Sequence, residues 1–469
     1  MSSASDAKFQ KMTTEPVEKL VCKLALPTII SMLVTTFYNL ADTFFVRQLN
    51  NDSMVAAVGV VLPLMNIIQA FGFFCGHGSG NYISRALGRR DKNDAEIMCA
   101  TGFGWAIIFG LAISIPGLIF REPLAVLLGA KTEATLAATV DYMTWILLAV
   151  PFMTGAVVLN NQLRMQGNAV FAMVGLTSGA ILNIILDPIL IFGAGLGVTG
   201  AAMATAISHL ISFVLLIFGL FKSDNIRIKL KNFTLSPKYL MGIVQGGLPS
   251  LARQGLASIA TACLNHAVGI YVSGDAMIDA VQAAMTGTSS LMLLLASALI
   301  GFGQGFQPVC GFNYGAKKYD RVIDSYNFCV KLSAVVLVFI SVIGFIFARP
   351  IVSTVAGTSK LAEDIATLAF RAQLCSFPLM SWVILCNMLL QNIGLTFKAT
   401  FVAAARQGLT FIPCVLLLPL IVRLFGYTPV LGLQLAQAVS DILAFVISLP
   451  IGIGVLKTMG KEFEKPDKN

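Results

Sequence analysis

The sequence contains little charge: 12% of its 469 residues are Asp, Glu, Lys or Arg, whereas 57% are hydrophobic, and the mean hydropathy is +0.82. Soluble domains carry charge on roughly a quarter of their residues. The composition therefore excludes a soluble domain. Long stretches with few or no charges recur along the chain, each long enough to cross about 30 Å of hydrocarbon as a helix. We expect an all-α integral membrane protein.

Several sequence motifs are also absent. None of the nine cysteines forms CxxC, and the three histidines are scattered with no HExxH, which argues against a disulfide framework, a zinc site or a metal-dependent intramembrane enzyme. The chain also lacks a GxSx motif beside a histidine, so the sequence does not indicate a rhomboid-like enzyme. Without a GxxxxGK[ST] motif the chain has no nucleotide-driven motor and needs no cofactor. If it moves a solute uphill, an ion gradient must drive the movement.

Twelve apolar stretches are long enough to span a membrane. Their approximate ranges are 20–46, 54–80, 95–120, 139–161, 168–193, 197–221, 240–272, 277–306, 325–348, 365–391, 398–422 and 428–455.

The distribution of basic residues predicts the orientation. The N-terminal segment has no apolar core and no small-residue cleavage site, so it is not a signal peptide and should remain in the mature protein. Lys and Arg are concentrated in alternate loops, most of all at 85–92 and 222–238. Because such loops stay on the cytoplasmic side, both termini should be cytoplasmic. The same loops explain the net charge of +9 without nucleic acid, since they can face anionic lipid headgroups.

The chain contains an internal repeat. NDSMVAAV at 51–58 resembles GDAMIDAV at 274–281, and GHGSG at 76–80 resembles GFGQG at 301–305. Each copy holds six spans. An even number gives the copies parallel topology, related by an axis along the membrane normal. We expect two lobes, 1–222 and 239–469, joined by a cytoplasmic linker at 223–238.

The repeat continues in later spans: Gly167 matches Gly394, and GAAMATAIS at 200–208 matches GLQLAQAVS at 432–440. Duplicated six-span lobes are typical of transporters that open a central site alternately to either face. The alternative is that duplication built a larger bundle with no transport role. The scale of the repeat favours a transporter.

Two acids in the first copy are expected deep inside the membrane. A carboxylate near a helix centre costs on the order of 2.5 to 3.5 kcal/mol, so Asp42 and Asp187 should face a cavity or a partner. Asn183 lies four residues before Asp187 and therefore shares its helix face. Tyr38 and Asp42 repeat this spacing on the first span. The two pairs predict a site for a proton or a cation.

Asn160 and Thr205 would add oxygen ligands from two further spans, and oxygen is what hard cations prefer. The alternative is that such polar groups only join neighbouring helices. The second copy places Asn265 at the position of Asp42, and Ile412 or Cys414 at that of Asp187. Because neither position is acidic there, the acids indicate a specialised ion site rather than a need of the lobe itself.

Asp441 is the acid in the middle of a span of the second copy. Arg406 lies at a comparable depth on the preceding span, so we expect a structural ion pair between them. Arg253 and Arg371 are alternative partners. His209 occupies the position equivalent to Asp441 and is expected to be a hydrogen-bonded residue of the bundle rather than a proton relay.

These motifs together resemble the multidrug and toxin extrusion (MATE) family. The resemblance extends from about Glu15 to Leu456 and is greatest for bacterial members of the MepA-like and DinF-like kind. It is carried by LALP and NLADTFFV in the first span, ISRALGRRD, LNNQLRMQGNA, NIILDPILIFG, GVTGAAMATAIS and GFGQGFQPVCGFNYGAK.

The resemblance implies a fold and an activity. It implies two six-helix bundles in a V around a cavity, in a protein that exports amphipathic, often cationic, small molecules in exchange for H+ or Na+. It also implies a monomeric, multi-pass protein of the bacterial cell (inner) membrane. A lipid-linked precursor flippase of the same superfamily is the alternative, but such a protein would have more than twelve spans.

The resemblance also implies residue roles. Pro27 matches a family proline around which the first span has been proposed to bend. Acids that NorM-like members carry in the second lobe are absent here from spans seven and ten, so no sodium site is expected there. The family's proton or sodium site maps onto Asp42, Asn183, Asp187 and Thr205, with Tyr38, Tyr142 and Asn160 around it, and with Asn161 as a substitute for Asn160.

Overall fold

The computed structural model describes residues 3–463 except 50, 223–225, 227 and 355–358. Within these residues it consists of helices and short connections, with no strand. The first half comprises α1 (Ser3–Thr14), α2 (Val17–Arg47), α3 (Asp52–Gly88), α4 (Lys92–Ile119), α5 (Arg121–Leu128), α6 (Glu133–Met165), α7 (Ala169–Pro188), the π-helix η1 (Ile189–Gly193) and α8 (Gly197–Lys222). The predicted linker at 223–238 lies partly outside the described residues and holds the 3-10 turn η2 (Leu230–Asn232).

The second half repeats this order with more interruptions. It comprises α9 (Pro237–Tyr271), α10 (Asp275–Gly315), α11 (Tyr319–Ile346), α12 (Ala348–Val352), α13 (Lys360–Ser376), the 3-10 turn η3 (Phe377–Leu379), α14 (Met380–Ile393), α15 (Thr396–Ala404), the π-helix η4 (Ala405–Thr410), α16 (Phe411–Leu424) and α17 (Pro429–Phe463). The short helices α1, α5 and α12 lie outside the predicted spans.

The helices agree with the predicted spans with one qualification. Among the described residues, 11 helical segments are long and apolar enough to cross a membrane. The predicted span at 240–272 corresponds to α9, which has 35 residues but is not among those 11. Polar side chains such as Arg253, Gln254 and His266 reduce its apolar character. Length alone would allow α9 to cross.

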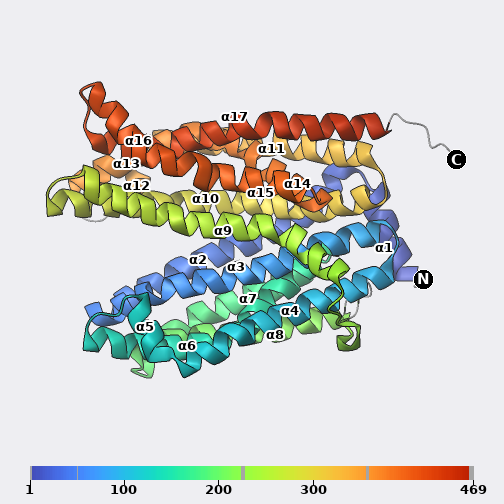
Figure 1. Cartoon of the computed structure of the whole chain (residues 1–469), viewed down its shortest axis with the longest axis horizontal. Coiled ribbons are helices and arrows are strands. Elements are labelled where there is room, and N and C mark those ends of the chain that lie inside the picture. The colour runs from blue at the N-terminus through green and yellow to red at the C-terminus, as the bar shows by residue number, and fades with distance from the viewer. Residues whose placement is uncertain (1–2, 50, 223–225, 227, 355–358, 464–469) are drawn as a thin grey trace.

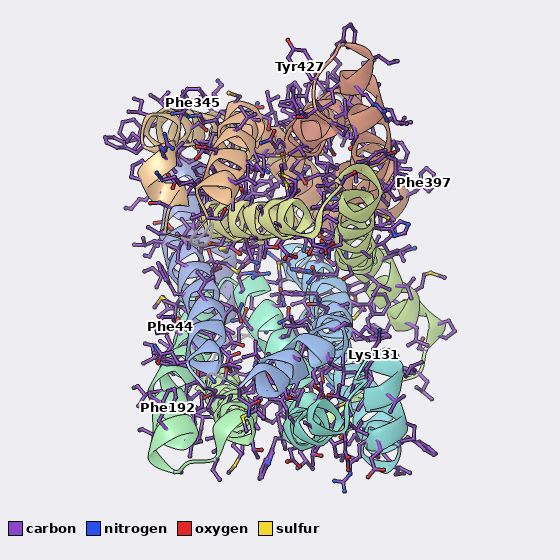
Figure 2. The ribbon with its side chains drawn as sticks, turned by 90° about the vertical axis from the view of Figure 1, so that its left-hand side faces the viewer. Phe44, Lys131, Phe192, Phe345, Phe397 and Tyr427 are labelled. Carbon is purple, nitrogen blue, oxygen red and sulfur yellow. The ribbon has the colours of Figure 1, made fainter. Side chains whose placement is uncertain are left out.

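The helices form two bundles, α2–α8 and α9–α17, which occupy the lower and upper halves of Figure 1. We call them the N-lobe and the C-lobe. They meet where α2 packs against α10 and α3 packs against α9. Large apolar side chains point away from both lobes in Figure 2, including Phe44, which is 57% exposed, and Phe397, which is 84% exposed. An apolar surface of this extent is what a bilayer covers.

Backbone conformation repeats between the lobes. Gly167 and Gly394, which the sequence matched, have φ of 76° and 88° at the ends of α6 and α14. Arg90 and Lys317, each two residues after the end of its helix (α3 and α10), have φ of 62° and 60°, and they are the described non-glycine residues with positive φ. This left-handed conformation is uncommon for residues with a Cβ. Its occurrence at matching turns shows that the two copies share their local geometry.

The ends of α3 and α10 cross at two glycines. A Cβ added to Gly88 would lie 2.3 Å from the Phe312 carbonyl oxygen, and one added to Gly315 would lie 2.2 Å from the Arg85 carbonyl oxygen. Only glycine allows the two backbones to approach so closely. The lobes are therefore in main-chain contact at this crossing.

Candidate functional site

Asp187 is the next-to-last residue of α7, at a break in regular helical bonding. Its side chain is fully buried. Pro188 follows and has no N–H to donate, and the chain continues as the π-helix η1. π-Helical turns inside longer helices occur frequently at functional sites. The sequence thus places a carboxylate where the backbone departs from the α-helix in the middle of a span.

Asn183 connects this carboxylate to α8. In the amide orientation that satisfies both of its ends, its nitrogen donates to Asp187 Oδ2 at 3.2 Å and its oxygen accepts from the Thr205 backbone N–H at 3.2 Å. All three residues are at most 3% exposed. The predicted sharing of one helix face by Asn183 and Asp187 is therefore realised as a direct contact, and Thr205 joins it from the next helix.

Asp42 faces this cluster from α2. Its Oδ1 atom is buried and has no hydrogen-bond partner. Its carboxylate interacts electrostatically with that of Asp187. Among the described residues, no Lys, Arg or His lies within 4 Å of either carboxylate, since neither forms a salt bridge. Two acids are thus held near each other in the protein interior without a protein cation.

Two tyrosines complete the group. Tyr38 interacts electrostatically with both acids, and so does Tyr142, which is fully buried and whose hydroxyl has no hydrogen-bond partner. The cluster is rich in oxygen and carries negative charge, a combination that suits a proton or a hard cation such as Na+. Within the described part of the chain, no three His, Cys, Asp or Glu side chains come together as a transition-metal site would require.

The two asparagines of α6 make other contacts. Asn160 Nδ2 donates to the Ala172 carbonyl oxygen at 2.9 Å, and Asn387 Nδ2 makes the matching bond to Ala399 at 2.7 Å in the C-lobe. Because the bond recurs in the lobe that lacks the acids, helix packing accounts for it, and it leaves the Asn160 side-chain oxygen unused. Asn161 Oδ1 accepts from Arg164 Nη2 at 2.5 Å, so that amide is engaged away from the acids.

Asp441 forms a salt bridge in the C-lobe. Arg406 Nε lies 2.9 Å from Asp441 Oδ1, and Gln437 Nε2 donates to the same oxygen at 2.8 Å. Of the two alternative partners, Arg371 Nε donates to a backbone carbonyl 3.3 Å away. Arg253 has no carboxylate within 4 Å among the described residues. His209 is partly buried at the matching place in the N-lobe.

Pro27 lies inside α2, which continues through it without a break. The Ser31 hydroxyl donates to the Pro27 carbonyl oxygen at 3.0 Å. The next residue, Thr28, donates to the Gly301 carbonyl oxygen of α10 at 2.6 Å. The proline therefore sits where α2 is attached to the opposite lobe.

One acidic residue that the sequence analysis did not single out joins the lobes. Asp94, which is 5% exposed, accepts from Lys238 Nζ at 2.6 Å and from the Tyr239 hydroxyl at 2.9 Å, both at the start of α9. It also accepts from Tyr82 at 2.8 Å and Arg89 at 3.2 Å in its own lobe. The position of Asp94 just after the basic segment 85–92 could have marked it as a candidate for an ion pair. Its partners in α9 could not be inferred, because they depend on how the helices pack.

A buried arginine was also missed. Arg164 is 2% exposed and donates to Gln304 Oε1 of α10 at 2.5 Å as well as to Asn161. Among the described residues it has no carboxylate partner, and its Nε atom has no hydrogen-bond partner. The residue lies within the matched LNNQLRMQG motif, but its contact with the other lobe could not be inferred from spacing.

The MatE family model matches residues 27–189 and 249–416, one segment in each lobe. The chain belongs to the MatE family. It is 28% identical to the multidrug export protein MepA of Staphylococcus aureus (strain MRSA252) over 94% of this chain and 96% of that protein. It is 29% identical to MepA of Staphylococcus haemolyticus (strain JCSC1435) over 92% of each.

Solved structures of the family have the same fold. A MATE family transporter of the MOP superfamily, solved in an outward-facing conformation, superposes with a TM-score of 0.88 at 25% identity, covering 96% of this chain and 98% of that one. The MatE chain described here is accordingly a multi-pass membrane transporter and not an enzyme. The predicted family and all-α fold class are confirmed.

Proposed function

We propose that this transporter is a secondary active antiporter that exports amphipathic, often cationic, compounds in exchange for H+ or Na+. The observation that carries the proposal is the pair of N-lobe acids, Asp42 and Asp187. They interact with each other and lack a protein cation, and one buried Asp42 oxygen has no partner. Charges at membrane depth normally mark an ion pathway when no structural partner neutralises them.

Coupling follows from a difference in affinity between states. An ion taken up from outside lowers the negative charge of the acid pair by one and thereby changes how α2, which carries Asp42, packs against α7 and α10. Exchange requires only that ion and exported compound prefer different conformations. The MepA relatives are multidrug export proteins, which supports the export direction.

The site residues then have separate roles. Asp42 and Asp187 take the proton or share the sodium ion, with Asn183, Thr205, Tyr38 and Tyr142 supplying oxygens or orienting the acids. Pro27, beside the α2–α10 contact, is the place where α2 would bend. Asn160 and Asn161, which bond elsewhere, support the packing of α6.

The orientation completes the proposal. Both termini lie on the cytoplasmic side of a bacterial cell membrane, and the chain works as a monomer with lobes at 1–222 and 239–469. The basic segments 85–92 and 222–238 support this orientation because they lie at the same end of the spans.

Purified protein in proteoliposomes tests the function. The vesicles carry an imposed H+ or Na+ gradient, and the uptake or release of a fluorescent cationic dye is followed with each ion in turn. Export driven by one gradient and abolished when that gradient is collapsed is the expected result. Dye movement that is indifferent to both gradients would contradict ion coupling, and movement of a lipid-linked precursor instead of dye would favour a flippase.

Variants of the acids test the site. Asp42→Asn and Asp187→Asn should each remove gradient-driven export, because a neutral amide cannot release a proton and binds Na+ weakly. Asp141→Asn is the matched control, since Asp141 lies in the same lobe but is exposed. If both site variants exported dye at the wild-type rate, the assignment of the acids would be wrong.

A further inference from the structure

A small cavity lies beside the N-terminal helix α1, far from the acid pair. Its volume is about 180 Å³, which is room for much more than one water molecule. Three lysines line it, Lys8 and Lys11 from α1 and Lys23 from α2. No acidic residue is among the lining residues. We call it the lysine pocket.

Two of these lysines are held against each other. Lys11 and Lys23 line the same pocket, and burial, together with the neighbouring Lys23, lowers the pKa of Lys11. Glu15, one turn further along the chain, acts in the opposite direction. Like charges repel, so an anion bound in the pocket would relieve the repulsion between the two lysines.

The walls of the pocket are fixed by contacts on other sides of α1. Asn313 Nδ2 donates to the Met12 carbonyl oxygen at 3.1 Å, and Lys318 Nζ donates to the Thr13 carbonyl oxygen at 2.9 Å. Lys8 bonds to Asn168 Oδ1 at the opposite rim. Helix α1 is therefore docked on both lobes, and its lysines are presented at a set position.

The other side of the pocket is apolar and open to the outside. Val170 and Phe171, at the start of α7, line the pocket and are 57% and 39% exposed. Leu20 and Leu24 of α2 complete this wall. The lining of the pocket thus combines three cations with an apolar surface that is partly exposed, at the end of the molecule where α2 and α7 begin.

We propose that the lysine pocket binds the phosphate headgroup of an anionic membrane lipid, with the acyl chains against Val170 and Phe171. Basic pockets between helices at the cytoplasmic surface, where the proposed orientation puts α1, suit such headgroups because each Lys near an anionic surface adds to the attraction. A soluble phosphate compound would use the cations but gain nothing from the apolar wall. The site is separate from the acid pair and does not depend on the proposed export function.

Lipid binding to the full-length protein tests the proposal without any transport. Native mass spectrometry of the purified protein, titrated with phosphatidylglycerol or with phosphatidylcholine, gives a dissociation constant for each lipid. The wild type should bind at least one phosphatidylglycerol in preference to phosphatidylcholine. The variant Lys8→Gln, Lys11→Gln, Lys23→Gln should bind that lipid about tenfold more weakly or worse, as loss of three cations implies.

Three controls make the result decisive. The variant Lys398→Gln, Lys457→Gln, Lys461→Gln removes the same charge from exposed lysines outside the pocket and should bind as the wild type does. An equal loss in both triple variants would overturn the proposal, because binding would then follow overall charge. The arginine variant Lys8→Arg, Lys11→Arg, Lys23→Arg keeps the charge and should retain the preference, which separates binding from folding.

A third arm separates the sources of phosphate. Inorganic phosphate at millimolar concentration should not displace the lipid from the wild type. If inorganic phosphate displaced it fully, or if phosphatidylcholine bound equally well, the pocket would not be a site for an anionic lipid.

Discussion

The fifth spans of the two lobes have the same local backbone feature but opposite charges. In the N-lobe, η1 follows Asp187, and in the C-lobe, η4 contains Arg406. Arg406 is paired with Asp441 on the neighbouring helix, whereas Asp187 has no cation among the described residues and lies near a second acid. The C-lobe copy thus contains an acid paired with a cation, and the N-lobe copy contains two neighbouring acids without a cation among the described residues.

The difference shows how a duplicated fold can separate two roles. A paired charge inside a membrane protein holds helices together and has no net charge to exchange. Two acids without a protein cation can instead take up a proton or a cation from the solution. The same backbone break therefore supports packing in the C-lobe and, on our proposal, ion binding in the N-lobe.

Removing the charges of each lobe in turn should have very different effects on export. Asp187→Asn should reduce gradient-driven dye export to the level of vesicles without protein. The double variant Arg406→Gln, Asp441→Asn should keep export within about threefold of the wild type, because it removes a neutral pair. Initial rates of dye movement in proteoliposomes give both values. Loss of export in the double variant with Asp187 intact would place an ion site in the C-lobe.

A single change in the C-lobe pair should act on stability. Asp441→Asn leaves Arg406 without its carboxylate and should lower the free energy of unfolding by about 2 kcal/mol, less than for a fully buried pair because the Arg406 side chain is 28% exposed. The double variant should recover most of this loss. Thermal unfolding in detergent measures both, and a double variant less stable than Asp441→Asn alone would show that the two residues are not energetically coupled.

The two matched asparagines allow the finest test. Asn160→Ala and Asn387→Ala each remove one bond between neighbouring helices and should each cost about 1 kcal/mol of stability. Neither should change which ion drives export. If Asn160→Ala changed the ion dependence of export and Asn387→Ala did not, Asn160 would belong to the ion site.

The sequence predicted the fold well because hydropathy and the internal repeat act at the scale of whole helices. It also predicted that Asn183 and Asp187 lie side by side, since a spacing of four residues places both on one helix face. It could not decide what Asn160 contacts, because that bond depends on how α6 meets α7. The contacts of Asp94 and Arg164 across the lobes depend on tertiary packing, which no local pattern contains.

The crossing of α3 and α10 also limits how the two lobes can diverge in sequence. At Gly88 and Gly315 the lobes touch through main chain, because a Cβ on either residue would lie within 2.3 Å of a carbonyl oxygen of the other helix. A side chain at either position must push the two helices apart, so these two residues fix the closest approach of the N-lobe and the C-lobe.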